Sequence, residues 1–274
     1  MPKFFFNRRI RNIPTNPTLE FANQILEEAK KFHATEIESE GGGSVIDVAK
    51  YVAWKLNIPH AAIPTTAGTG SEVTKYAVFI DNNRKIAFED TELIPDKYIL
   101  DADKLTTLPP EIIASTGLDA LSQSIESWWS PLATDGSRRF AEKSVRKILD
   151  NSYNFYKNPN NEVCGEQMLI AANYSGRAIN TTRTSICHAV SYPLTIFYNI
   201  PHGFACAYTL PYFVKLFKPA IIHWQQIEIL LQFLDFKKIP VNKDRIADES
   251  LAYPNAQNTP IKVTKKMILE ALCL

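Results

Sequence analysis

Three consecutive glycines followed by a helix-forming segment constrain the fold of this 274-residue chain more than any other feature. The run Gly41-Gly42-Gly43 continues as Ser44 and the apolar segment 45–56. Glycines at a strand-to-helix junction let backbone amides approach an anion and direct the helix N-terminus at it. The pattern fits a pyrophosphate, and an ordinary flexible turn is the alternative for a glycine triplet alone.

The neighbouring segments have the alternating rhythm of a doubly wound α/β layer. Apolar residues recur at helical spacing over 18–32, after a start signal at 16–18. Segments with strand character follow the glycines. We predict strands over 60–65, 76–81, 85–90 and 97–101.

The segment before the glycines is unusual for such a layer. Glu36, Glu38 and Glu40 alternate there, whereas a buried parallel strand is nearly all apolar. Glu40 beside a pyrophosphate would be repulsive.

Beyond Pro110 the pattern changes to long helices. We predict helices over 111–129, 137–156, 162–180 and 184–198, and a helical stretch over 205–217. We place a domain boundary at 108–110. The prediction is a partial α/β domain over 1–109 and an all-helical domain over 110–274.

Charge and composition exclude several classes of protein. Lys and Arg number 30 against 29 Asp and Glu, so no global field attracts nucleic acid or an anionic membrane. The four cysteines lack CxxC spacing and are interpreted as reduced, mostly buried thiols. The first apolar run is too short for a signal peptide, and no run approaches a membrane span. We expect a cytoplasmic protein.

A second loop of small residues lies downstream, in PTTAGTGSEVT. It carries five hydroxyls in eleven residues, and paired with the glycine loop it suggests a ligand clamp. The hydroxyl residues are Thr65, Thr66, Thr69, Ser71 and Thr74.

The second half contains residue types that bind metals. Asp119 and Gln123 share one helix face, and His188 and His202 lie fourteen residues apart, the second in a Pro-His-Gly break. One carboxylate and two imidazoles are plausible ligands of a divalent metal, with a position left for substrate. The alternative is that these histidines satisfy backbone groups in the core. We give His33, His60 and His223 that second interpretation.

Four motifs in order resemble the iron-containing alcohol dehydrogenase superfamily over about residues 16–217: GGGSVIDVAK, IPTTAGTGSEVT, TGLDAL and HAVSYPL with IPHG. The resemblance implies a dehydroquinate synthase-like fold, with an α/β dinucleotide-binding layer followed by an all-α metal-binding domain. It also implies NAD(P)-dependent interconversion of alcohols and carbonyls. DALSQSIESWWS and TTRTSICHAVSYPLT look most like the phosphonoacetaldehyde reductase branch, which makes 2-hydroxyethylphosphonate.

The resemblance assigns roles residue by residue. Pyrophosphate binding falls on Gly41, Gly42, Gly43 and Ser44, with Asp47 supporting the helix behind them. Contacts to phosphate, ribose and nicotinamide fall on Thr65, Thr66, Thr69 and Ser71. The metal ligands fall on Asp119, His188 and His202, with Gln123 where the family normally has a fourth, a histidine.

Two departures from the family pattern bear on chemistry. The amide oxygen of Gln123 is a weaker donor than imidazole, so we expect iron or zinc to be weakly held. Tyr192 stands where the family commonly has another histidine, and with His188 it is the predicted catalytic pair. A phenol donates a proton more readily than it accepts one at neutral pH, which favours reduction. Arg183, five residues before His188, is the candidate that binds an anionic group of the substrate.

Compared with the family, the chain looks truncated at the N-terminus and shortened after residue 217, where only the segment 258–274 resembles the last family helix. The favoured function is reduction of a small, anionic aldehyde by NADH or NADPH, and a homodimer is the assembly we consider for this chain. Alternatives are a catalytically inactive relative that retains nucleotide or partner binding, and a metal-independent reductase that uses His188 and Tyr192 directly.

Overall fold

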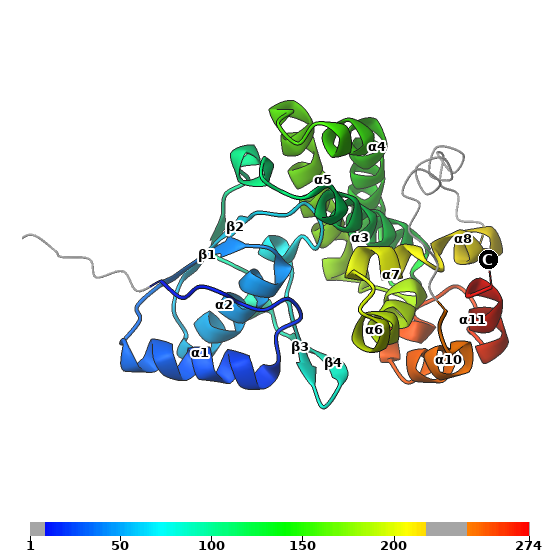
Figure 1. Cartoon of the computed structure of the whole chain (residues 1–274), viewed down its shortest axis with the longest axis horizontal. Coiled ribbons are helices and arrows are strands. Elements are labelled where there is room, and N and C mark those ends of the chain that lie inside the picture. Colours follow the sequence, from blue (N-terminus) through cyan, green and yellow to red (C-terminus); the bar gives the residue numbers. More distant parts are fainter. Residues whose placement is uncertain (1–8, 218–239, 274) are drawn as a thin grey trace, which may run out of the picture.

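The computed structural model describes residues 9–217 and 240–273. An α/β part built from the N-terminal residues lies against a larger helical part (Figure 1). The predicted fold class, an α/β layer followed by an all-helical domain, is confirmed.

The α/β part has two helices packed against short strands. Its helices are α1 (Leu19–Lys31) and α2 (Gly43–Leu56). Its strands are β1 (Ile37–Gly41), β2 (His60–Pro64), β3 (Tyr76–Asp81), β4 (Arg84–Glu89) and β5 (Lys97–Tyr98). The 3₁₀ turn η1 (Ser71–Val73) lies in the second small-residue loop.

The strands form two separate sheets. β1, β2 and β5 are parallel in that order, and β3 and β4 form an antiparallel hairpin. Asn82 and Asn83 turn this hairpin with positive φ, a conformation that asparagine tolerates. The predicted strand over 97–101 was too long. β5 ends at Tyr98 because the chain leaves the sheet near Asp101, whose side chain caps a 3₁₀ turn.

The acidic alternation in β1 has a simple explanation. Within the described residues β1 is an edge strand, with Glu38 and Glu40 on an exposed face and Ser39 and Gly41 buried. The Glu40 carboxylate forms an ion pair with Lys104 at 2.9 Å. The alternation that is unusual for a buried parallel strand is thus accounted for, because this strand is covered on one face only.

The helical part begins at Pro110, beside the proposed boundary. Its helices are α3 (Pro110–Trp129), α4 (Asp135–Lys157), α5 (Glu162–Thr182), α6 (Ile186–Tyr198), α7 (His202–Ala207), α8 (Leu210–Phe217), α10 (Lys243–Leu251) and α11 (Lys265–Ala271). α3 is the central helix: most of its residues are buried. No helix in the described ranges is both long and apolar enough to span a membrane.

Two helix predictions need correction. The stretch 205–217 is two helices, since the chain turns between α7 and α8. The helix predicted from residue 184 begins at Ile186, because Arg183 has a positive φ of 60° and ends α5 there. His223, which we interpret as a core histidine, lies outside the described residues.

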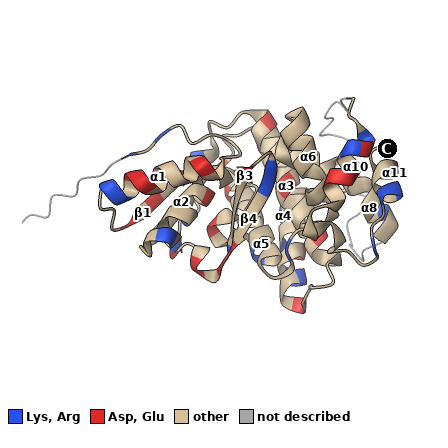
Figure 2. Ribbon diagram, turned by 90° about the horizontal axis from the view of Figure 1, so that it is seen from below, with Lys and Arg blue, Asp and Glu red and all other residues tan. Residues whose placement is uncertain are grey.

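The two parts are joined by buried polar contacts. Asn173 on α5 donates a hydrogen bond to Glu72 in η1 at 2.9 Å, and Asn180 accepts one from the backbone N–H of Lys75. The β3–β4 hairpin reaches the helical part, where β4 contacts α6 (Figure 1). Acidic and basic segments alternate along the ribbons instead of gathering on one element (Figure 2). The hairpin and η1 thus bring α/β residues next to the helices.

Candidate metal and cofactor site

Three helices bring the predicted metal ligands together. Asp119 comes from the middle of α3, His188 from the first turn of α6 and His202 from the start of α7. Asp119 Oδ1 lies 3.2 Å from His188 Nε2 and 3.9 Å from His202 Nε2. Cys206, one turn further along α7, completes a cluster whose ligand atoms all lie within 4.8 Å of one another.

The cluster fits a divalent metal. Bonds of about 2.0–2.3 Å in a tetrahedral site place neighbouring ligand atoms roughly 3.3–3.6 Å apart. Three separations within the cluster are 3.2, 3.8 and 3.9 Å, close to that range, and every pair of ligand atoms lies within 4.8 Å. A carboxylate, two imidazoles and a thiol are also ligand types that zinc and iron accept.

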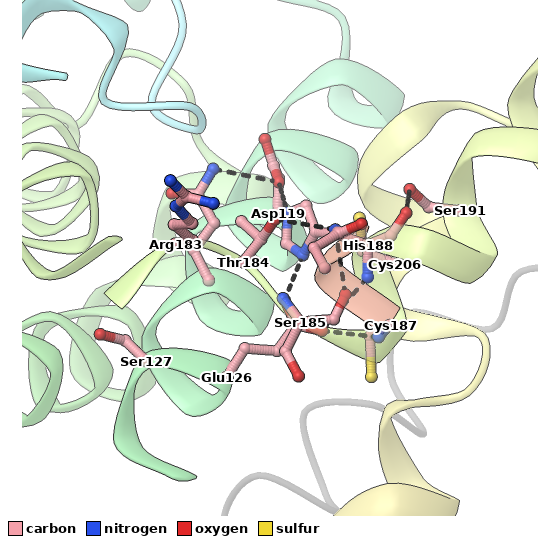
Figure 3. A network of polar contacts seen from close by, with 12 residues as sticks. Asp119, Glu126, Ser127, Arg183, Thr184, Ser185, Cys187, His188, Ser191 and Cys206 are labelled. Carbon is pink, nitrogen blue, oxygen red and sulfur yellow. Dashed lines mark hydrogen bonds and ion pairs between the residues drawn. The ribbon is translucent and has the colours of Figure 1, made fainter. Parts of the chain in front are cut away.

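Glu126 orients one of these imidazoles (Figure 3). Its carboxylate lies 2.5 Å from His188 Nδ1 and accepts backbone N–H bonds from Ser185 and Cys187 at the start of α6. Glu126 is fully buried. Because Nδ1 is engaged, Nε2 of His188 is the nitrogen left for a metal. Sequence reasoning missed Glu126, although its position seven residues after Asp119 places it on the same face of α3.

Gln123 lies beside Asp119 on that face. Its Nε2 is 3.4 Å from Asp119 Oδ1, and its Oε1 accepts a hydrogen bond from Ser175 Oγ at 2.9 Å. Both ends of the amide therefore have partners within the protein.

The electrostatics of the cluster favour a cation next to Asp119. Burial alone would raise the pKa of Asp119, but His202 and His188 hold it below its usual value. Burial alone would lower the pKa of His188, yet Cys206, Glu126 and Asp119 raise it well above its usual value. Burial, together with Lys85, lowers the pKa of His202 to about 3. His188 Nε2 and Asp119 Oδ1 face each other at 3.2 Å, and a metal ion would take the position between them.

Tyr192 and Lys85 border the cluster. The Tyr192 ring stacks on His202 with centroids 6.3 Å apart, and its hydroxyl lies 3.4 Å from Asn255 Nδ2. Lys85 comes from β4; its Nζ lies 3.4 Å from His202 Nδ1 and 5.1 Å from the centre of the Tyr192 ring. Burial raises the pKa of Tyr192, so the phenol keeps its proton, and burial lowers the pKa of Lys85.

Arg183 follows the last residue of α5 and pairs with a residue outside the cluster of Asp119, His188, His202 and Cys206. Its guanidinium forms an ion pair with Glu89 at 2.7 Å, and about half of its side chain is exposed. Lys75 shares the same carboxylate at 2.9 Å. The ammonium group of Lys85 faces His202, a predicted metal ligand. Sequence reasoning missed Lys85, because no local pattern reveals how a hairpin docks.

The two small-residue loops lie against each other. α2 begins at Gly43 with Gly42 as an N-cap that offers no side-chain hydrogen bond. A Cβ at Gly42 would stand 3.2 Å from Thr66 Oγ1, and one at Gly43 would stand 2.7 Å from the Thr69 methyl group. The backbone N–H of Thr65 donates to the Gly41 carbonyl. The amides at the start of α2 and the threonine hydroxyls thus lie in one place, as an anion site requires.

Asp47 and Ser71 lie behind these loops. Asp47 accepts hydrogen bonds from Ser71 Oγ at 2.5 Å and from the Val78 N–H at 3.0 Å. The buried Lys50 ammonium donates to Ser71 and Thr74. Ser44 Oγ accepts from the N–H of Asn16. In the structure these side chains hold the loops and the hairpin in place.

Models of one family match most of the chain. The model for iron-containing alcohol dehydrogenases matches residues 7–102, and the model for the C-terminal part of that family matches residues 113–247. The chain belongs to the iron-containing alcohol dehydrogenase family.

Curated relatives from this family share about a third of the aligned residues. The 1-propanol dehydrogenase of Salmonella typhimurium is 32% identical over 206 residues, which cover 72% of this chain and 56% of the relative. The sulfoacetaldehyde reductase of Bilophila wadsworthia is 30% identical over 218 residues, with 72% and 56% covered. The chain therefore spans just over half the length of the curated relatives it matches.

Solved structures of iron-containing alcohol dehydrogenases have the same fold. The sulfoacetaldehyde reductase of Bifidobacterium kashiwanohense, in complex with NAD+, superimposes with a TM-score of 0.88 and 27% identity, covering 96% of this chain and 81% of that one. The iron-containing alcohol dehydrogenase of Thermotoga maritima gives a TM-score of 0.86 and 27% identity, covering 97% and 83%.

Proposed function

We propose that this iron-containing alcohol dehydrogenase relative reduces a small aldehyde to an alcohol with NADH or NADPH, assisted by a divalent metal. The observation that carries the proposal is the convergence of Asp119, His188 and His202 within one buried cluster. Relatives with this family's sequence act on alcohols and on sulfoacetaldehyde, which supports the reaction class.

Each residue of the candidate site has a separate role in the proposed reduction. Asp119, His188 and His202 would hold a divalent cation, which would supply Lewis-acid activation of a carbonyl oxygen, and a bound reduced nicotinamide would supply the hydride. Glu126 keeps the His188 ring in the tautomer that presents Nε2 to the site. Tyr192 holds a proton beside His202 at neutral pH and is the proposed donor to the product oxygen. The amides at the start of α2 receive the pyrophosphate of the cofactor.

We propose further that the aldehyde carries an anionic group, with phosphonoacetaldehyde as the candidate. The support is Lys85, a partly buried lysine whose ammonium group lies beside His202 and forms no ion pair with a carboxylate of the described residues. A sulfonate or phosphonate oxygen is a natural partner for it. Arg183 is the second candidate, although its guanidinium already has Glu89 as a partner.

The test compares aldehydes that differ in charge. We expect the protein to oxidise NADH or NADPH with phosphonoacetaldehyde or sulfoacetaldehyde at a higher kcat/KM than with neutral propanal. Lys85→Met should lower kcat/KM for the anionic aldehydes by about 2–4 kcal/mol of transition-state stabilisation, the cost of leaving one side of a buried charge pair alone. The loss with propanal should be far smaller.

Arg183→Ala is the matched comparison for the anion. If Arg183→Ala lowers kcat/KM for the anionic aldehydes selectively and Lys85→Met does not, Arg183 and not Lys85 binds the anionic group. Equal losses with charged and neutral aldehydes in both variants would refute the anionic substrate. Absence of turnover with every aldehyde, in protein loaded with metal, would refute the reductase and favour an inactive relative.

A further inference from the structure

Cys206 shares a helix face with one of the metal ligands. His202 and Cys206 are four residues apart on α7, so both side chains point in the same direction. The Cys206 Sγ lies 3.8 Å from His202 Nε2. It is fully buried, and its charged neighbours include His188 and Asp119 (Figure 3).

We propose that the Cys206 thiolate is the fourth protein ligand of the metal, completing a set with Asp119, His188 and His202. This inference rests on the metal dependence of the proposed function. The separation of 3.8 Å from His202 Nε2 compares with roughly 3.6 Å between a sulfur and a nitrogen bound to the same tetrahedral zinc. The four ligand atoms lie within 4.8 Å of one another, so side-chain shifts of about 1 Å bring them to bonding distance of one ion.

The Gln123 amide is not available as the fourth metal ligand. Its Oε1 already accepts from Ser175 Oγ, and its Nε2 faces the Asp119 carboxylate. Turning the amide over would set its oxygen against a carboxylate oxygen with no proton between them, which is unfavourable. Gln123 is therefore a positioning residue that fixes the Asp119 carboxylate, and the ligand expected at this position from the sequence comes from α7 instead.

The charges also balance. A carboxylate and a thiolate carry two negative charges, and two neutral imidazoles add none, so the set neutralises a divalent cation. Metal binding displaces the thiol proton to solvent, because the thiolate is the form that binds. A thiolate is a soft ligand that binds zinc strongly. We therefore expect zinc to be held tightly, in contrast to the weak site that Gln123 alone predicts.

The test uses metal spectroscopy on the full chain. Cobalt(II) loaded in place of the native metal should show the near-ultraviolet charge-transfer band of a thiolate ligand. X-ray absorption of the zinc-loaded protein should show one sulfur at about 2.3 Å beside nitrogen and oxygen at about 2.0–2.2 Å.

Matched variants locate the sulfur. Cys206→Ala and Cys206→Ser should both lose the cobalt band and weaken zinc binding by more than about 100-fold, beyond the 10–100-fold typical of second-shell partners. Cys164→Ala, which removes a buried cysteine on α5, should keep the band. Gln123→Ala should keep the band and lose about 10–100-fold in affinity, as expected of a positioning residue.

The outcomes separate this inference from the proposed function. Cobalt bound without a thiolate band, or a band that persists in both folded Cys206 variants, overturns the ligand assignment and leaves metal-dependent reduction in place. Wild-type protein that binds neither cobalt nor zinc overturns both. Circular dichroism of the two Cys206 variants shows whether each has folded before its spectrum is interpreted.

Discussion

His60 shows how a single buried histidine couples this fold to pH. It lies on β2 with its Nε2 2.8 Å from Ser39 Oγ, and its Nδ1 has no hydrogen-bond partner in the described part of the chain. Burial, followed by the charge of Lys50, lowers the pKa of His60 to about 4. The folded protein therefore keeps this imidazole neutral well below the usual pKa of histidine.

We expect His60 to contribute to acid unfolding. As the pH falls below about 6.5 the unfolded chain takes up a proton at His60, whereas the folded chain does so only near pH 4, so stability falls across that window. The loss should reach roughly 3 kcal/mol at about pH 4 and below. His60→Gln should flatten the slope of unfolding free energy against pH, measured by urea denaturation at a series of pH values.

His33→Asn is the control for this measurement. The interpretation of His33 as a core histidine was wrong, because it is exposed in the turn just after the end of α1. The variant therefore removes a histidine from the chain without removing a buried one. A slope between pH 6.5 and 4 that is the same in His60→Gln and in the wild type would show that His60 does not drive the acid response.

For single residues, the sequence predicts which side chains have a functional role better than it predicts which side chains lie next to them in the fold. Asp119, His188 and His202 could be picked out because their motifs are distinctive, and the structure brings them together. Lys85 could not, because it is 117 residues from His202 and its only local signal is a strand. Cys206 fits an ordinary apolar helix pattern, so its place beside the histidines depends on how α7 packs.

Among the elements, long helices are the most predictable. α3, α4 and α5 begin and end within three residues of the predicted bounds, because a long apolar periodicity averages over local exceptions. The end of β5 was misplaced and the break between α7 and α8 was missed, since two residues of strand and one turn between apolar helices leave little pattern. Their position depends on tertiary packing.

Gly203 determines how closely α7 approaches α3. A Cβ at this position would stand 1.6 Å from the Ser115 carbonyl oxygen and 3.0 Å from the backbone nitrogen of Asp119. The Gly203 N–H also donates to Ser115 Oγ. This approach brings His202, the residue before it, next to Asp119.

Gly203→Ala should therefore displace α7 and separate the metal ligands. We expect a loss of about 3 kcal/mol or more in unfolding free energy, at the upper end of overpacking effects, together with loss of bound metal. Urea denaturation and elemental analysis of the same purified sample measure the two effects.

Gly117→Ala is the control on α3 itself. Its Cβ would meet only the terminal methyl of Met168 at 3.4 Å, which a flexible side chain accommodates. We expect a change within about 1 kcal/mol and normal metal content. Full metal content and stability in Gly203→Ala would show that the contact between α7 and α3 does not set the site.

At the scale of the whole molecule, a chain of hydrogen bonds through Arg177, Asn173 and Glu72, called here the polar relay, links the proposed cofactor loops to the helical part. Arg177 Nε donates to Asn173 Oδ1 at 2.8 Å, and Asn173 donates to Glu72 at 2.9 Å. Arg177 also reaches the Tyr98 hydroxyl on β5. Glu72 and Asn173 are both nearly inaccessible to solvent, and burial raises the pKa of Glu72 against the effect of its hydrogen bonds. Without its hydrogen-bond partners, a buried carboxylate such as Glu72 would lower the stability of the folded protein.

Asn173→Ala should weaken the contact between the two parts. It removes the donor to Glu72 and the acceptor for Arg177, and leaving buried polar groups without partners costs about 1–3 kcal/mol each. We expect about 2–4 kcal/mol less unfolding free energy in urea. We also expect kcat/KM of the proposed reduction to fall, because the proposed cofactor loops and the proposed metal ligands lie on opposite sides of this contact and their spacing would set the reacting geometry.

Asn151→Ala is the control: it removes an asparagine that does not lie in the contact between the two parts. Asn151 donates only to the Lys147 carbonyl of its own helix, α4, so its removal should change stability by less than about 1 kcal/mol. Glu72→Gln tests the charge, since an amide accepts the same bond from Asn173 without a buried negative charge. If Asn173→Ala matches Asn151→Ala in both stability and turnover, the relay does not hold the two parts together, and the apolar contacts between them must do so.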